Sequence, residues 1–152
     1  MFTNRHIENA PRAALKRWRG WVQDRSGAAA VEFAFIGPIM VVMLIGIMSY
    51  GGYFWLAHSV QQLANDAARA AVAGLSASER QSLAQSTISS EVPNYVFLNA
   101  TGMVTSVNTQ TNSMTVTIAY DASQTPFFAL GNLVPMPSST ISRTATIMLA
   151  GY

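Results

Sequence analysis

The feature that most constrains this chain is an apolar stretch from Phe33 to Ala57, which contains 25 residues and no charge. A helix needs about 20 such residues to cross a hydrocarbon core of about 30 Å, so the stretch is long enough to span a membrane. Aromatic residues, which favour membrane–water interfaces, stand near both of its ends. They are Trp18 and Trp21 before it, and Tyr50, Tyr53, Phe54 and Trp55 within its far end. The sequence therefore predicts one membrane-spanning helix.

The charges are segregated around this stretch. Residues 1–26 hold six basic and two acidic side chains, whereas the rest of the chain holds three basic and five acidic ones. By the positive-inside rule, residues 1–27 are predicted to be a cytoplasmic leader, and the chain after about residue 58 is predicted to be periplasmic. A nucleic-acid binder would carry its basic surface on the folded domain, so we expect no nucleic-acid partner.

Two features near the N-terminus leave alternatives open. A cleaved secretory signal has an apolar region of about 7 to 15 residues, so the longer stretch here disfavours cleavage at the small residues Ser49 and Gly51. In the leader, the spacing of Leu15, Trp18 and Val22 suits a short basic helix that lies on anionic lipid. An unstructured tail that only directs membrane insertion is the alternative.

Beyond the apolar stretch the period stays helical. Val60, Leu63, Ala67 and Ala71 form a narrow stripe, which predicts that one helix continues over residues 28–74 with Gly74 as its C-cap. Within this helix, Pro38 is expected to bend the chain or simply to be tolerated. The pair Gly51 and Gly52 suggests close packing between helices.

Residues 75–152 are predicted to form a small α+β head. Ser76 and Glu79 have capping-box spacing, and Leu75, Leu83 and Ile88 give a second helix a weak apolar face until Val92–Pro93 ends it. Alternating residues then predict an antiparallel sheet of about three strands. Their segments are residues 103–110, residues 114–120 and the region of Ile141 to Leu149, with a turn in which Asn112 takes a positive φ. The apolar segment 125–137 must cover the sheet or meet a partner.

The chemistry of most enzymes is missing. The chain has no cysteine and two histidines, His6 and His58, which the predicted topology places on opposite sides of the membrane. A zinc site needs three or four clustered ligands, and a hydrolytic triad needs a histidine beside its nucleophile. We therefore expect no enzyme, no metal site and no cofactor, and a membrane-anchored hydrolase is disfavoured.

The most informative segment is RSGAAAVEF, residues 25–33, at the entrance to the apolar stretch. It resembles the processing site of type IV pilin-like proteins, in which a membrane aspartic peptidase cuts after a glycine and a glutamate stands fifth in the mature chain. Residues 25 to about 74 look like the TadE-like pseudopilins of tight adherence (Flp, type IVb) pili. The resemblance implies cleavage between Gly27 and Ala28, a role for Glu32 and Phe33 in subunit assembly, and minor rather than major pilin status, since Phe33 stands where major Flp pilins tend to have tyrosine.

The same resemblance implies partners: a prepilin peptidase, other pilins and pseudopilins, an inner-membrane assembly platform, and membrane lipid. The physical argument centres on Glu32, because a carboxylate in an apolar helix costs free energy unless it is paired or reaches the interface. Cleavage would create an amine at Ala28 that could pair with Glu32 of a neighbour. The competing hypothesis is an uncleaved, single-pass periplasmic module that binds a ligand or an envelope protein through its sheet.

Overall fold

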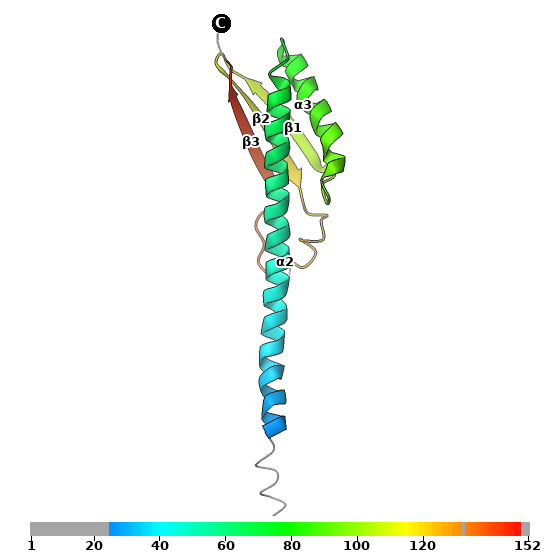
Figure 1. Ribbon diagram of the computed structural model, residues 1–152, viewed down its shortest axis with the longest axis vertical. Coiled ribbons are helices and arrows are strands. Elements are labelled where there is room, and N and C mark those ends of the chain that lie inside the picture. The colour runs from blue at the N-terminus through cyan, green and yellow to red at the C-terminus, as the bar shows by residue number, and fades with distance from the viewer. Residues whose placement is uncertain (1–24, 132, 150–152) are drawn as a thin grey trace, which may run out of the picture. The chain divides into compact units, whose positions relative to one another are not determined.

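A computed structural model describes residues 25–131 and 133–149 of the chain. Helix α2 (Arg25–Ala71) comes first, followed by helix α3 (Ala77–Glu91), two 3₁₀ turns, η1 (Val92–Asn94) and η2 (Ala100–Gly102), and strands β1 (Met103–Thr109), β2 (Ser113–Asp121) and β3 (Thr140–Met148) (Figure 1). The α+β class, the long first helix and the three-stranded sheet are therefore confirmed. The basic leader, with its predicted lipid-surface helix, lies outside the described residues.

The chain divides into two units, one ending at Val41 and one beginning at Val42. In the first unit, α2 exposes every side chain from Ala28 to Val41. Pro38 lies inside the helix, and the helical assignment is unbroken on both sides of it. The Phe33 ring covers Gly37 one turn later, where an added β-carbon would lie 3.6 Å from Phe33 Cε1.

In the second unit, the strands form an antiparallel sheet in the order β1-β2-β3. Central strand β2 buries every second residue, which is the reason its alternating sequence identified it as a strand. Figure 1 shows α2 crossing the sheet with α3 beside it. Residues from both helices and from β2 and β3 share one core, whose largest fully buried side chains are Leu56, Val60, Leu63, Met114, Val116, Ile118 and Ile141.

Small residues bring α2 close to this sheet. The predicted stripe of Val60, Leu63, Ala67 and Ala71 is fully buried, and Ala64 and Ala68 are buried beside it. An alanine side chain loses no rotamer freedom on burial and lets the helix backbone approach its neighbours closely. The narrow apolar stripe is thus the packing face of the head.

Helix α3 starts as its sequence predicts but is joined to α2 differently. The Ser76 hydroxyl accepts a hydrogen bond from the Glu79 amide at 3.2 Å, and the Glu79 carboxylate accepts one from the Leu75 amide at 2.8 Å. Helix α2 ends at Ala71, three residues before the expected C-cap Gly74, and no described glycine has a positive φ. Gly74 is required for another reason: a β-carbon there would lie 2.8 Å from the Arg80 backbone nitrogen. Leu75 belongs to no apolar face, since its side chain is almost fully exposed.

Both edges of the sheet are partly sealed by glutamine side chains. On β1, Gln81 of α3 donates to the Thr105 carbonyl at 3.2 Å and accepts from the Val107 amide at 3.0 Å, as a neighbouring strand would. On β3, Gln61 of α2 donates to the Thr144 carbonyl at 3.1 Å. These contacts occupy backbone groups through which an open edge could pair with another chain. The predicted hairpin between β1 and β2 is confirmed, but Asn112 does not have the expected positive φ.

Candidate functional site: the start of helix α2 and the foot of the head

The four residues predicted to serve processing and assembly lie in the first turns of α2. Gly27 and Ala28 follow its first residue, Arg25, so the predicted scissile peptide bond is inside a helix. Ala28 and Glu32 are four residues apart and therefore share one helix face. Gly27, Ala28, Glu32 and Phe33 are all exposed, and a β-carbon added at Gly27 would meet nothing within 4 Å.

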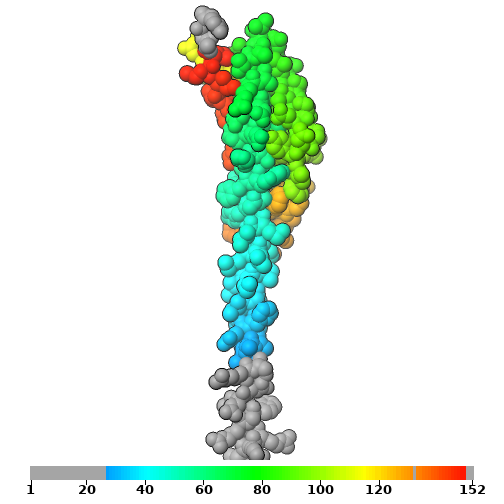
Figure 2. Space-filling view, viewed as in Figure 1, coloured from blue at the N-terminus to red at the C-terminus, as the bar shows by residue number. Residues whose placement is uncertain are grey.

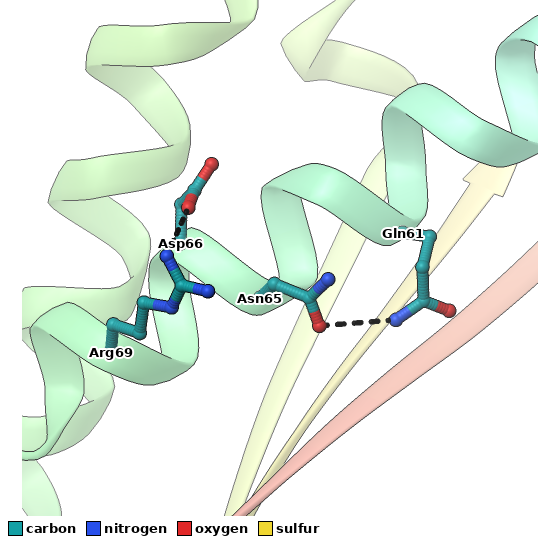
Figure 3. A network of polar contacts seen from close by, with 4 residues as sticks. All are labelled: Gln61, Asn65, Asp66 and Arg69. Atoms are coloured by element: carbon teal, nitrogen blue, oxygen red, sulfur yellow. Dashed lines mark hydrogen bonds and ion pairs between the residues drawn. The ribbon is translucent and has the colours of Figure 1, made fainter.

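Glu32 is a carboxylate on an otherwise apolar surface. In the part of the chain that the structure describes, one ion pair occurs, and it joins Arg69 and Asp66 at 3.9 Å on the same helix, far from Glu32 in sequence (Figure 3). The side chains that follow Glu32 are large and exposed, including Phe35, Ile36 and Ile39. The segment thus presents one charge together with a broad apolar surface.

Two loops of the head wrap α2 between Gly46 and Trp55; we call them the foot. The foot consists of residues 95–98 and residues 122–137 without residue 132. An added β-carbon at Gly46 would lie 3.8 Å from Val134 Cγ1, and the Tyr50 hydroxyl donates to the Pro135 carbonyl at 2.6 Å. Figure 2 shows the longer of the two loops, in orange, against the helix.

Aromatic rings hold the foot to the helix. Tyr53 packs against Phe128 with ring centroids 6.3 Å apart, and Trp55 packs against Phe97 at 6.1 Å. Phe97 also packs against Phe127 at 5.1 Å, which joins the two loops to each other. The aromatic residues that the sequence assigned to a membrane interface therefore also make the contacts between helix and head.

Gly51 and Gly52 were expected to allow close packing between helices, and the structure gives the two residues different surroundings. A β-carbon at Gly52 would clash with the Phe127 ring, whereas one at Gly51 would meet nothing within 4 Å. Gly52 is thus a close-packing site, but its neighbour is a loop of the same chain instead of another helix. Phe127 and Phe128 belong to the apolar segment 125–137, which was expected to cover the sheet or to meet a partner. Both side chains pack against the core.

The foot changes where a membrane boundary can lie on α2. Irregular backbone exposed to lipid does not occur within the hydrocarbon region, so in an anchored chain the foot must stay outside that layer. The hydrocarbon-embedded part then ends near Ile45, and Gly27 to Ile45 rises about 28 Å, close to the thickness of a bilayer core. Glu32 stands five residues after Gly27, which is a rise of about 8 Å along a helix.

Phe97 is a residue that the sequence did not single out. Its φ is 70°, and it is the one non-glycine residue with a positive φ among the described residues. Its carbonyl accepts a hydrogen bond from the Tyr120 hydroxyl at 3.0 Å. A left-handed phenylalanine is strained, so these contacts must offset that strain. No local sequence signal marks the position, because glycine or asparagine would be the usual choice.

Other polar groups of the head form no obvious reactive site. Burial, followed by the charge of Asp66, raises the pKa of Glu91, and burial together with these two carboxylates raises the pKa of Tyr95. No group of three or more potential metal ligands occurs within residues 25–131 and 133–149. His58 is exposed on α2.

Comparison with known proteins adds one finding. The model of a protein family described as TadE-like protein matches residues 27–69, which include the four predicted site residues and the buried stripe except for Ala71. Helix α3 and the sheet lie outside the matched range. No significant match was found among curated proteins or among solved structures.

Proposed function

We propose that the chain is a structural pseudopilin needed to assemble a tight adherence pilus, because the model of the TadE-like protein family matches its residues 27–69. In this proposal α2 anchors the protein in the inner membrane in a single pass, and a prepilin peptidase removes the leader after Gly27. The observation that carries the proposal is the one carboxylate, Glu32, one turn after Ala28, in the part of α2 from Ala28 to Val41 that is otherwise apolar and exposed.

The local structure around Gly27 favours cleavage there. A peptidase needs an extended peptide, and the bond after Gly27 lies at the frayable end of α2. Glycine disfavours helix by about 1 kcal/mol relative to alanine, which lowers the cost of unwinding this turn. Its missing side chain also leaves the bond accessible, since no described atom lies near its β-position.

The energetics of Glu32 favour a role in assembly. An isolated carboxylate near a membrane edge can reach the headgroups at modest cost. When helices pack together the carboxylate loses water and must find a cation, and a new amine at Ala28 of a neighbouring subunit supplies one. Ala28, Ala29 and Ala30 are small enough to permit that close approach.

The proposed partners follow from this role. Besides the peptidase, they are other pilins and pseudopilins, the inner-membrane assembly platform, and lipid around α2. The leader is cytoplasmic and the head periplasmic in this topology, which fusion reporters can test. A C-terminal reporter that is active in the periplasm is expected, and one that is active only in the cytoplasm would contradict the proposal.

Assembly is tested by changing Glu32 in cells that hold the complete pilus system. Glu32→Ala and Glu32→Gln should insert and lose the leader normally, yet crosslink to the other pilins much less than the wild type. Glu91→Gln, which removes a carboxylate from the head, is the matched control and should assemble normally. Unchanged crosslinking and normal pili in both Glu32 variants would show that Glu32 only reaches toward the headgroups.

The competing function, an uncleaved periplasmic binding module, makes a different prediction. It requires mature protein that retains Met1 and a head that captures its ligand without other pilins. The outward face of the sheet carries two threonine pairs, with Thr115 bonded to Thr146 at 3.0 Å and Thr117 to Thr144 at 3.1 Å, and at its ends Asp121 and the exposed Met148. Nothing in that face indicates a ligand, so the pseudopilin role is the better supported.

A further inference from the structure

We propose that the foot is a lipid-contact surface, which rests the head on the membrane surface beside the anchoring helix. This inference rests on the membrane anchoring in the proposed function, but on neither cleavage nor pilus assembly. It concerns the second unit alone, in which α2 from Val42 onward and both foot loops are described together.

The side chains that the foot exposes are apolar, and neither the sheet nor the helices cover them. Val96 is 63% exposed and Leu133 is 58% exposed, and Phe97 and Leu130 are also exposed. On the helix between the loops, Phe54 and Trp55 are exposed as well. Aromatic and aliphatic side chains of this kind suit the boundary between headgroups and acyl chains.

Charge is absent from the foot. The segments 92–120 and 122–142, which contain both loops, hold no Asp, Glu, Lys or Arg. The nearest charge in the sequence is Asp121, whose carboxylate accepts a hydrogen bond from the Ser123 amide at 2.9 Å where the longer loop begins. Asp66 and Arg69 lie more than ten residues beyond Trp55 on α2. Residues without charge avoid the desolvation cost that a lipid interface imposes on ions.

The backbone of the longer loop is partly satisfied by its own turns. Amides of Thr125, Phe128 and Gly131 donate to the carbonyls three residues earlier, at 2.9 to 3.1 Å. Leu133 closes a further turn onto the Leu130 carbonyl at 2.9 Å. Internal hydrogen bonds lower the cost of bringing a loop to a membrane surface, where water is scarce.

Continuity with the anchor identifies lipid as the occupant. Immediately before the foot, α2 exposes large apolar side chains in the same unit, including Val42, Met43 and Leu44. Val134 lies against Gly46 and Tyr50 against Pro135, so the foot begins where this lipid-facing surface ends. Any bilayer that covers Met43 reaches the foot within about one or two helical turns.

The absence of native cysteine makes a direct test possible. Single cysteines replace Leu133 and Val96 in the full-length chain, are labelled with a fluorophore sensitive to polarity, and are reconstituted in phosphatidylcholine vesicles. Leu75→Cys is the matched control, because Leu75 is an exposed leucine beyond the opposite end of α2, with 92% of its surface accessible. Met43→Cys reports on the anchor itself.

The expected result is blue-shifted emission at positions 133 and 96, strong quenching by lipids that carry a quencher, and protection from iodide in water. The label at position 75 should stay sensitive to iodide and insensitive to the lipid quencher. Iodide-sensitive labels at 133 and 96 would overturn the proposal, and so would labels shielded from both quenchers, because a second protein would then cover the foot. If either of these two outcomes is observed while the label at position 43 is quenched by lipid, α2 is still anchored in the membrane. Only the proposed contact between the foot and lipid is then ruled out.

Discussion

The two parts of helix α2 are both apolar, yet they differ in the size and placement of their side chains. From Phe33 to Met48 large side chains such as Phe35, Ile39 and Met43 point in all directions and stay exposed. From Leu56 to Ala71 the apolar side chains are mainly alanine, are confined to one face and are buried. The first part leaves its surface available to lipid or to other subunits, and the second part packs against the head of the same chain.

This difference shows that hydrophobicity alone does not determine whether an apolar helix is exposed or packs against its own chain. A helix that is hydrophobic all round is typical of a membrane span or a buried core, whereas a narrow stripe indicates packing against one neighbour. Gly46 to Trp55 is the transition, where the foot covers one face while Ile47, Met48 and Phe54 remain exposed. The comparison yields three predictions about head stability, followed by a direct test of processing.

The largest effect should separate two leucines of the same helix. Leu63→Ala removes a fully buried side chain and should cost the head about 2 to 5 kcal/mol. Leu44→Ala changes an exposed side chain and should shift stability by no more than about 0.5 kcal/mol. Urea unfolding of the full chain in mild detergent, followed by near-ultraviolet circular dichroism, measures both. Equal losses would show that the two parts of α2 pack alike.

A smaller effect should separate the neighbouring glycines. Gly52→Ala forces the Phe127 ring out of its place on α2 and should destabilise the head by about 1 to 3 kcal/mol. Gly51→Ala enters open space and should stabilise the helix by up to about 1 kcal/mol. The same urea titration compares them, and a stabilising Gly52→Ala would mean that the foot is not held against the helix.

The smallest effect concerns pH. Because the pKa of Glu91 is raised in the folded head, the folded protein retains a proton that the unfolded chain releases just above the ordinary pKa of glutamate. Stability should therefore fall slightly as pH rises through that window, and Glu91→Gln should flatten the slope. Asp121 acts in the opposite direction, since hydrogen bonds from Ser123 lower its pKa and its contribution is lost in acid. If Glu91→Gln leaves the slope of stability against pH unchanged, groups other than Glu91 cause the pH dependence.

The sequence predicted what depends on local periodicity. The 3.6-residue stripe located the buried face of α2, the alternation in residues 114–120 located β2, and the capping pair Ser76 and Glu79 located the start of α3. In each case one element buries one face, so its pattern of apolar and polar residues can be read within a short stretch of sequence.

The contacts between distant segments could not be read in this way. Gln81 pairs with β1 across more than twenty residues, and Phe127 packs on Gly52 across more than seventy. Gly74 was expected to be the C-cap of α2, but its role is to let Arg80 approach, which requires knowing where α3 folds back. For the candidate site, spacing was sufficient to find Gly27 and Glu32, while the limit that the foot sets on the membrane span needed the structure.

The most direct test of the central claim is the intact mass of the protein extracted from membranes that contain the partner peptidase. The account predicts a chain that begins at Ala28 and has lost the 27-residue leader, and it predicts that Gly27→Leu retains the leader while Gly51→Leu is cut normally. Wild-type protein that keeps Met1 in the presence of the peptidase, or that begins after Gly51, would contradict the account.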